Sequence, residues 1–319
     1  MGYRTPLEAR LAKKTTKAIF DYDMIADGDR VMVGLSGGKD SWALIQILDV
    51  LRQRAPIDFS LVAVNVDSGY DGFQHQQVGE ACAARGWEFH HVTTTIGATI
   101  DDKLDAGATP CSLCARLRRG VLYRLATQVG ATKIALGHHA DDFIETLLLN
   151  VFFAGALKAM PARLVSDDRK HVVVRPLVYV LEEEARAYAK ASNLPIIGCC
   201  CPACGDLSLQ RQRVKRLLME LEREHPGVKS SLLKALSNVA PRHLLDRRLN
   251  PPGAPLLREL ADAHDGAERP EHGVEPASAD GPAAGARDDS HALADNHSPL
   301  ASDAASLAAR IIPLLSRPS

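Results

Sequence analysis

The segment Val31–Leu48, "VMVGLSGGKDSWALIQIL", decides the fold of this 319-residue chain. Its first three residues are apolar, as in a buried strand, and the apolar residues from Leu44 to Leu48 follow the spacing of a helix. The turn between these two parts holds two glycines, a lysine and two serines. Glycines let backbone N–H groups close around phosphate oxygens, and a helix N-terminus attracts anions. The segment therefore predicts a strand, a phosphate-binding turn and a helix.

Strands and helices alternate after this segment. The expected strands are 31–36, 59–66, 88–93, 132–137 and the apolar part of "HVVVRPL" (171–177), and the expected helices are 7–24, 40–53, 74–85, 115–128, 141–153, about 182–192, 206–224 and 230–239. This alternation predicts an α/β fold with a doubly wound parallel sheet and helical additions. Ligands of such sheets bind at the carboxyl ends of the strands. Residues 34–41, 67–69 and 137–139 each follow a strand, so we expect them to converge on one crevice.

The charge composition of the chain changes near residue 251. Residues 251–319 contain 5 Arg, no Lys and 11 acidic residues, so this part carries a charge of −6, whereas the first 250 residues, with 33 basic and 28 acidic groups, carry +5. The predicted parts are a basic N-terminal helix (1–27), a nucleotide-binding α/β domain (28–198), a cysteine-containing helical segment (199–250) and a disordered acidic tail (251–319). The mildly basic body is compatible with a nucleic-acid partner.

The sequence gives no sign of a membrane or secretory protein. No apolar run approaches the about 20 residues of a membrane span, and the first 20 residues lack the apolar core of a signal peptide. We therefore expect a cytoplasmic protein that does not enter a membrane.

Six of the seven cysteines fall into two clusters, Cys111-x-x-Cys114 and Cys199-Cys200-Cys201-x-x-Cys204. A CxxC pair lets two thiolates reach one metal ion, and a helix start with arginines nearby favours the thiolate form. A closed zinc site, a dithiol relay and an iron–sulfur cluster all remain open, because the spacing alone does not separate them. The residue chemistry alone slightly favours zinc. The remaining Cys82, on an expected helix, is predicted to be a buried apolar residue.

Acidic and basic residues gather near the expected crevice. The segment "GHHADD" (137–142) places Asp141 and Asp142 at the start of a helix, where they serve equally well as helix caps or as Mg²⁺ ligands and general bases. Basic runs lie next to both cysteine clusters and favour contacts to RNA phosphates over a merely solvated helix face. These runs contain Arg116, Arg118, Arg119 and Arg124, and Arg211, Arg213, Lys215 and Arg216.

The "SGGKDS" turn (36–41) resembles the PP-loop of the ATP pyrophosphatase superfamily, whose members adenylate a substrate and release pyrophosphate. The resemblance implies that Lys39 stabilises phosphate charge and that Asp40 is a candidate Mg²⁺ ligand. The ATP-binding residues that it implies are Ser36, Gly37, Gly38, Lys39, Asp40 and Ser41.

A wider resemblance covers about residues 7–246. The motifs "SGGKDS", "PCSLCARLRRG", "ALGHHADD" and "CxxCG…LQRQ" occur in this order in the tRNA 2-thiocytidine synthetases, the tRNA-cytidine(32) 2-sulfurtransferases. The resemblance implies ATP-dependent thiolation of cytidine 32 in the tRNA anticodon loop, with adenylation of the C2 oxygen and sulfur transfer by way of a [4Fe–4S] cluster. It also favours an iron–sulfur cluster over the zinc site that the residue chemistry alone slightly favours.

This resemblance assigns site residues and partners. It implies that Cys111 and Cys114 hold the cluster with Cys204, or with Cys201 as the alternative, because the extra cysteines here require a gap in the alignment. The implied catalytic residues are Lys39 with Asp141 or Asp142, and the implied tRNA contacts are Arg116, Arg118, Arg119, Arg211 and Arg213. The implied partners are tRNA, a cysteine desulfurase as sulfur donor and a second copy of the chain.

Two alternative functions stay open at this point. One is another PP-loop tRNA-modifying enzyme, similar to lysidine synthetase or a 2-thiouridine synthetase. The other is a zinc-stabilised RNA-binding module without enzymatic activity.

Overall fold

The computed structural model describes residues 3–104, 110–198, 200–201 and 209–249. The contacts between Cα atoms divide the chain into two compact units, Met1–Ser237 and Asn238–Ser319. In the second unit the described part contains one short 3₁₀ helix, Pro241–His243. No helix in the described part of the chain has the length and apolar character needed to cross a membrane. The predicted tail (251–319), Cys199 and Cys204 lie outside the described residues, and the predicted domain boundaries stay predictions.

Six strands form one sheet in the first unit. They are β1 (Arg30–Gly34), β2 (Ser60–Asp67), β3 (Glu88–Thr93), β4 (Lys133–Ala135), β5 (Arg163–Val165) and β6 (Val172–Val174), arranged in the order β3-β2-β1-β4-β6-β5. All neighbouring strands are parallel except β5, which runs antiparallel to β6. The predicted α/β class is thus confirmed for a mostly parallel sheet. The three-residue edge strand β5 was missed because so short a segment shows no periodicity.

The helices of the first unit are α1 (Pro6–Asp21), α2 (Lys39–Arg52), α3 (His75–Ala83), α4 (Ile96–Lys103), α5 (Cys111–Gln128), α6 (Ala140–Leu149), α7 (Glu182–Ala191), α8 (Gln210–Glu224) and α9 (Val228–Ala235). Helix α5 begins four residues before the expected start, so Cys111 and Cys114 lie in its first turn. Helix α4 was not expected. The expected helix 141–153 is divided, because α6 continues into a π-helical turn, Asn150–Ala154.

Alternate residues of the strands pack into two separate cores. Val31 and Val33 of β1 belong to a core that includes side chains from α1, α2, α3 and α7, whereas Met32 belongs to a core with α4 and α5. This alternation is the one that a sheet covered on both faces requires. Cys82 lies fully buried in the first of these cores, as predicted, and burial raises the pKa of its thiol to about 12.

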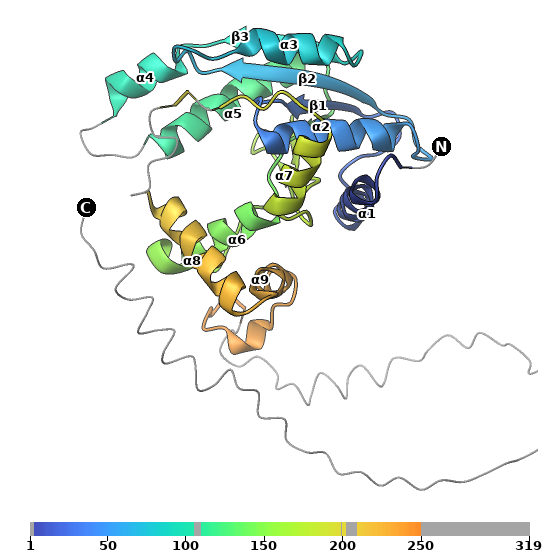
Figure 1. The fold of residues 1–319 in the computed structure, drawn as a ribbon. Coiled ribbons are helices and arrows are strands. Elements are labelled where there is room, and N and C mark those ends of the chain that lie inside the picture. Colours follow the sequence, from blue (N-terminus) through green and yellow to red (C-terminus); the bar gives the residue numbers. More distant parts are fainter. Residues whose placement is uncertain (1–2, 105–109, 199, 202–208, 250–319) are drawn as a thin grey trace, which may run out of the picture. The chain divides into compact units, whose positions relative to one another are not determined.

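A third, smaller core joins the helices that follow the sheet. Ile144 of α6 packs with Val214 and Leu218 of α8, and with leucines of α9. Figure 1 shows these three helices gathered together away from the strands. Since α6 starts directly after β4, this core brings α8 and α9 to the carboxyl edge of the sheet.

Candidate active site

The turn between β1 and α2 is shaped to receive an anion. Gly37 has a φ of +83°, which favours glycine, and a Cβ atom there would make a tight contact of 3.2 Å with the Cβ of Ile197. The Ser36 hydroxyl accepts a hydrogen bond from the Gly38 N–H (3.3 Å), and the Ser41 hydroxyl donates to the Gly38 carbonyl (2.9 Å). No side chain caps the start of α2. Its first-turn N–H groups, which have no partner within the helix, are therefore available to phosphate oxygens.

The segment after β4 lies against this turn. A Cβ atom on Gly137 would stand 3.0 Å from the backbone of Asp40 and Ser41, so only glycine allows the approach. Residues 34–41 and 137–138 thus meet as predicted. The prediction was wrong for residues 67–69, which are not among the residues that line the shared cavity. This segment turns toward β3 instead, where the Asp67 carbonyl accepts a hydrogen bond from the Thr94 N–H (3.0 Å).

A cavity of about 570 Å³ opens between this turn, the sheet and α5. Its volume falls in the range of small-molecule sites. One wall is apolar and the other carries charge and hydrogen-bonding groups, a combination that suits a nucleotide. The lining includes Ser36, Gly38, Asp40 and Ser41 from the turn, Val64, Val66, Ile134 and Val173 from the sheet, Ala115, Arg118, Arg119, Leu122 and Tyr123 from α5, and His138, Asp142 and Arg175.

Three arginines line the cavity without an acidic partner among the described residues. Arg118 donates to the Val66 carbonyl (3.3 Å), and the buried Arg175 donates to the Pro161 carbonyl (2.6 Å). The Nε atom of Arg175 is buried and has no hydrogen-bond partner in the described part of the chain. Together with Arg119, these side chains give the cavity the positive charge that a polyphosphate needs.

His138 contributes a neutral ring to the cavity. Burial, followed by the positive charge of Arg175, lowers its pKa to about 4. Its Nδ1 atom is buried and, within the described residues, has no hydrogen-bond partner. At neutral pH the ring therefore offers one acceptor and one donor to a ligand.

Asp40 presents a carboxylate oxygen to the cavity. Its Oδ2 atom pairs with Nζ of Lys39 at 2.9 Å, whereas its Oδ1 atom is buried and accepts no hydrogen bond from any described residue. The nearest ring nitrogen, Nε2 of His139, stands 3.7 Å away from Oδ1. A carboxylate oxygen of this kind fits a Mg²⁺ ion or a proton donor on a ligand.

Lys39 reaches away from the cavity. Its Nζ atom lies 3.0 Å from Oε1 of Glu182, and it is not among the residues that line the cavity. Glu182 also pairs with Lys215 (2.6 Å). Although burial opposes ionisation, Lys215 and Lys39 together lower the pKa of Glu182 to about 2. This role of Glu182 could not be predicted from the sequence, because three consecutive glutamates at a helix start are typical of ordinary N-terminal acids.

The two adjacent aspartates have different surroundings. Asp141 is only 3% exposed, accepts a hydrogen bond from the Glu182 N–H (2.7 Å) and pairs with Lys229 (2.7 Å), so it ties α6 to α7 and α9. Asp142 lines the cavity and also accepts from the His139 N–H (3.0 Å) as a cap of α6. Of the two, Asp142 is thus the one in a position to meet a ligand.

Both cysteine segments are next to elements that form the site. Cys111 is exposed and Cys114 is half-buried, and the next turns of α5 carry Arg118 and other lining residues. On the second segment, the Ile197 N–H donates to the Gly37 carbonyl (2.9 Å). Cys201 follows four residues later, so its Cα atom lies within about 14 Å of Ile197. Cys111 and Cys114 thus lie on the helix that forms one wall of the cavity, and Cys201 lies on a segment that contacts the phosphate-binding turn.

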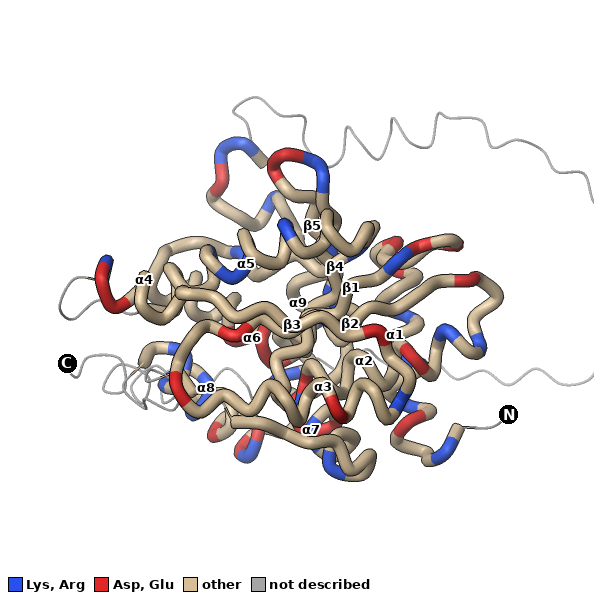
Figure 2. The backbone as a smooth tube through the Cα atoms, turned by 90° about the horizontal axis from the view of Figure 1, so that it is seen from above, with Lys and Arg blue, Asp and Glu red and all other residues tan. Residues whose placement is uncertain are grey.

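Apart from Arg118, which was described above, the predicted RNA-binding arginines fall into two groups. Arg211 pairs with Glu145 (3.0 Å) and Asp142 (3.6 Å), which fixes α8 to α6. The side chains of Arg116, Arg119 and Arg213 make no hydrogen bond or ion pair with any other described residue. Figure 2 shows Lys and Arg along both α5 and α8. The arginines of this second group are available to an external phosphate.

Comparisons with known proteins show the family of this chain. A family model described as a PP-loop domain matches residues 7–222, so the fold and the turn define a PP-loop protein. The tRNA-cytidine(32) 2-sulfurtransferase of Geobacter metallireducens is 52% identical over 233 residues, which cover 73% of this chain and 91% of that protein. The protein of the same name from Anaeromyxobacter sp. is 50% identical over 258 residues, 81% of this chain and 86% of that one. The chain belongs to the PP-loop family and, within it, to the tRNA-cytidine(32) 2-sulfurtransferases, a family of enzymes.

A solved structure supports the fold. The U34-tRNA thiolase NcsA from Methanococcus maripaludis, determined with its [4Fe–4S] cluster, matches with a TM-score of 0.60 at 24% sequence identity. The match covers 73% of this chain and 80% of that chain. The solved structure thus supports the predicted fold, and the 2-sulfurtransferase relatives confirm the membership predicted from the motifs.

Proposed function

We propose that this enzyme thiolates cytidine 32 of tRNA at C2, with ATP as the activating substrate. One observation carries the proposal beyond family membership: the cavity has the PP-loop on one wall and, on another, the helix whose first turn holds Cys111 and Cys114. A nucleotide on the first wall and a sulfur-carrying group at the helix start would be close to the same substrate base.

The ATP half of the site contains several polar atoms that have no hydrogen-bond partner among the described residues. The first-turn amides of α2, with Ser36 and Ser41, would hold the pyrophosphate part, and the cavity arginines would neutralise its charge. The C2 oxygen of cytosine leaves poorly, so its attack on the α-phosphorus, with release of pyrophosphate, turns it into part of an AMP leaving group. The free Oδ1 of Asp40 suits Mg²⁺, which when bound would supply charge neutralisation between phosphate oxygens.

The sulfur half depends on thiolates. Soft thiolate ligands fit an iron–sulfur cluster, and Cys111 and Cys114 in the first turn of α5 are accessible to it. We propose Cys204 as the third ligand, with Cys201 as the alternative. A [4Fe–4S] cluster held by only three thiolates supplies one iron with an open position for sulfur. A cysteine desulfurase would be the sulfur donor.

The tRNA would lie across α5 and α8. Arg116 and Arg213 are available to its backbone phosphates, and Arg119, which also lines the cavity, would meet phosphates of tRNA or of ATP. The target cytidine has to leave its stacked position to enter the cavity. Arg118 would then meet phosphates of ATP or tRNA at the cavity wall. A second copy of the chain in the complex is a separate proposal, which sedimentation of the protein with and without tRNA would test.

Reconstituted thiolation tests the proposal. Anaerobically purified full-length protein, given unmodified tRNA, ATP, cysteine and a cysteine desulfurase, should form 2-thiocytidine, measured by mass spectrometry of nucleosides. Pyrophosphate release should require tRNA. Cys114→Ser should abolish the product, and Cys200→Ser, a matched change on the second segment, should leave it unchanged.

Three results would contradict the proposal. A colourless zinc protein without ATP turnover would indicate an RNA-binding module. ATP turnover without a cluster would indicate another PP-loop enzyme. Full activity after replacement of both Cys201 and Cys204 by Ala would show that neither cysteine is the third ligand that the proposal requires.

A further inference from the structure

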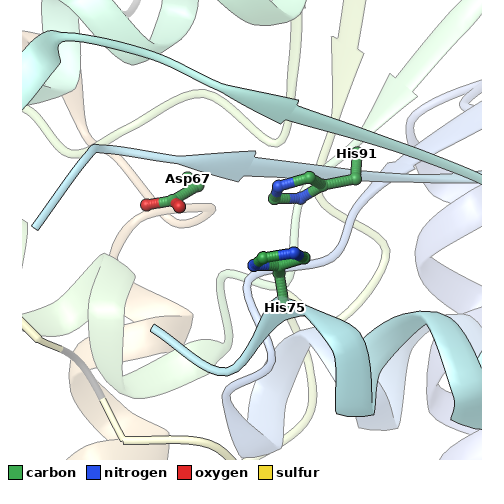
Figure 3. A group of neighbouring side chains, drawn as sticks. All are labelled: Asp67, His75 and His91. Carbon is green, nitrogen blue, oxygen red and sulfur yellow. The ribbon is translucent and has the colours of Figure 1, made fainter. Parts of the chain in front are cut away.

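A group of metal-ligating side chains lies outside the cavity. Asp67 ends β2, His91 lies in β3 and His75 begins α3, and one potential ligand atom from each lies within 4.8 Å of the others (Figure 3). None of the three lines the cavity described above. We propose that Asp67, His75 and His91 bind one divalent cation of the Zn²⁺ class.

The strand register explains why the group forms. Asn65 pairs with His91, and Asp67 pairs with Thr93, in the parallel ladder of β2 and β3. Because side chains alternate along a strand, Asn65, Asp67 and His91 share one face of the sheet. The intervening Val66 points to the other face, where it lines the cavity. Helix α3 packs on β2 and β3 and brings His75 to the same place.

Asn65 fixes which nitrogen of His91 is available. The buried Asn65 amide donates from Nδ2 to the Leu35 carbonyl (2.7 Å), so its Oδ1 atom is the one that lies 2.9 Å from Nδ1 of His91. An amide oxygen only accepts hydrogen bonds, and Nδ1 of His91 must therefore carry the proton. This leaves the lone pair of Nε2 for a metal ion. Metal-bound histidines are oriented in the same way, by donating their other N–H to an oxygen.

The other two residues complete the ligand set. Oδ1 of Asp67 accepts from the Gly69 N–H (2.8 Å), which leaves Oδ2 for a cation. The rings of His75 and His91 are stacked, with centroids 4.2 Å apart and planes at 11°. Tetrahedral ligands of Zn²⁺ stand about 3.4 Å apart. Binding therefore requires His75 to tilt out of the stack and the hydroxyl of Thr93, 3.2 Å from Nε2 of His91, to turn away. All three ligands are half-buried, which leaves them room to move.

The donor types select the cation. Two imidazole nitrogens and one carboxylate oxygen suit Zn²⁺ and related ions, whereas Mg²⁺ prefers oxygen ligands alone and iron–sulfur clusters prefer thiolates. Three protein ligands leave a fourth position for water or another donor. The site is thus different from both metal groups of the proposed function and does not depend on it.

Zn²⁺ binding to the full-length chain tests the proposal. Thiolates would compete for the ion, so the measurement uses a background in which six cysteines are replaced by Ser: Cys111, Cys114, Cys199, Cys200, Cys201 and Cys204. Titration against a chromogenic chelator should show one Zn²⁺ bound with a Kd of about 1 μM or tighter. His75→Ala and His91→Ala should each weaken binding at least about tenfold. His90→Ala is the matched control, because His90 is adjacent on β3 but points to the opposite face.

Two further measurements separate ligation from folding. The thermal midpoint of each metal-free variant reports whether it folds, and Asp67→Asn is the conservative variant, which should also weaken binding. In the ¹⁵N spectrum of the histidine rings, Zn²⁺ should shift Nε2 of His91 while Nδ1 keeps its proton. Unchanged Zn²⁺ affinity in folded His75→Ala and His91→Ala, or an unshifted Nε2 at saturating Zn²⁺, would overturn the proposal. If the alanine variants do not fold, Asp67→Asn and the ring spectrum decide it.

Discussion

Two groups of polar side chains near the PP-loop differ in whether they have partners within the protein. On the cavity side, Oδ1 of Asp40, Nδ1 of His138 and Nε of Arg175 are buried and have no hydrogen-bond partner among the described residues. On the other side, Lys39, Lys215 and Glu182 pair at 3.0 Å or less, as do Asp141 and Lys229. We call the first group the open cluster and the second the paired cluster.

The difference indicates what each cluster is for. A buried polar group without a partner lowers the stability of the fold, and native proteins keep few of them. The open cluster is therefore explained by a ligand that supplies the missing partners. The paired cluster already has its partners and joins α2, α6, α7, α8 and α9 around the loop. Adjacent residues of one helix also differ, because Asp141 belongs to the paired cluster whereas Asp142 lines the cavity.

The largest effect is expected from Asp141→Asn in the paired cluster. Removing one member of a buried ion pair leaves Lys229 without its partner, so the free energy of unfolding should fall by about 3–5 kcal/mol, measured by urea denaturation. Thiolation by the fraction that remains folded should stay within about threefold of the unaltered protein.

A double-mutant cycle checks the cause. Lys229→Met should remove most of the additional cost of Asp141→Asn, because no uncompensated charge then remains. A hundredfold loss of activity in Asp141→Asn with unchanged stability would instead place this residue with the open cluster.

Asp40→Asn should have the opposite result. The change removes a carboxylate charge from the ATP site, so thiolation should fall on the order of 100-fold, which is about 2.7 kcal/mol in transition-state stabilisation. The free energy of unfolding should fall by no more than about 1 kcal/mol, because Lys39 loses one partner but keeps its pair with Glu182. Asp49→Asn, on the same helix, is the control and should retain activity. Normal activity in Asp40→Asn would show that the unpartnered oxygen has no ligand.

Glu182→Gln tests the paired cluster through pH. A carboxyl group whose pKa is lowered from 4.5 to about 2 stabilises the folded state above pH 4.5, and this contribution is lost as the pH falls toward 2. The Gln variant has no carboxylate at this position to protonate. Its free energy of unfolding should therefore fall less steeply below pH 4.5 than that of the unaltered protein. The difference across this window should be on the order of 1 kcal/mol, because solvent screens the pairs. Parallel pH profiles for the two proteins would show that Glu182 is not ionised in this way.

Sequence reasoning succeeded where the signal is local. The strand, the glycine turn and the helix of residues 31–48 specify one another within a single segment, and Cys82 follows the apolar pattern of its helix. The partners of Lys39 and Asp141 come from α7 and α9, far along the chain, and no spacing rule reports them. The expected convergence of residues 67–69 was wrong for a similar reason: the place of a side chain depends on which face of β2 it occupies, not only on where the strand ends.

The smallest effect is expected for two arginines, Arg116 and Arg211, that the sequence alone does not distinguish. Arg116 is exposed and makes no ion pair with any described residue, whereas Arg211 is held by Glu145 and Asp142. Arg116→Ala should weaken tRNA binding by about three- to tenfold and reduce the slope of log K against log[salt] by about 1, since one phosphate contact is lost. Arg211→Ala should leave that slope unchanged, because its charge already has acidic partners within the protein. Filter binding of tRNA across a salt series measures both, and equal slopes for the two variants would mean that the division between open and paired charges does not extend to the RNA-binding surface.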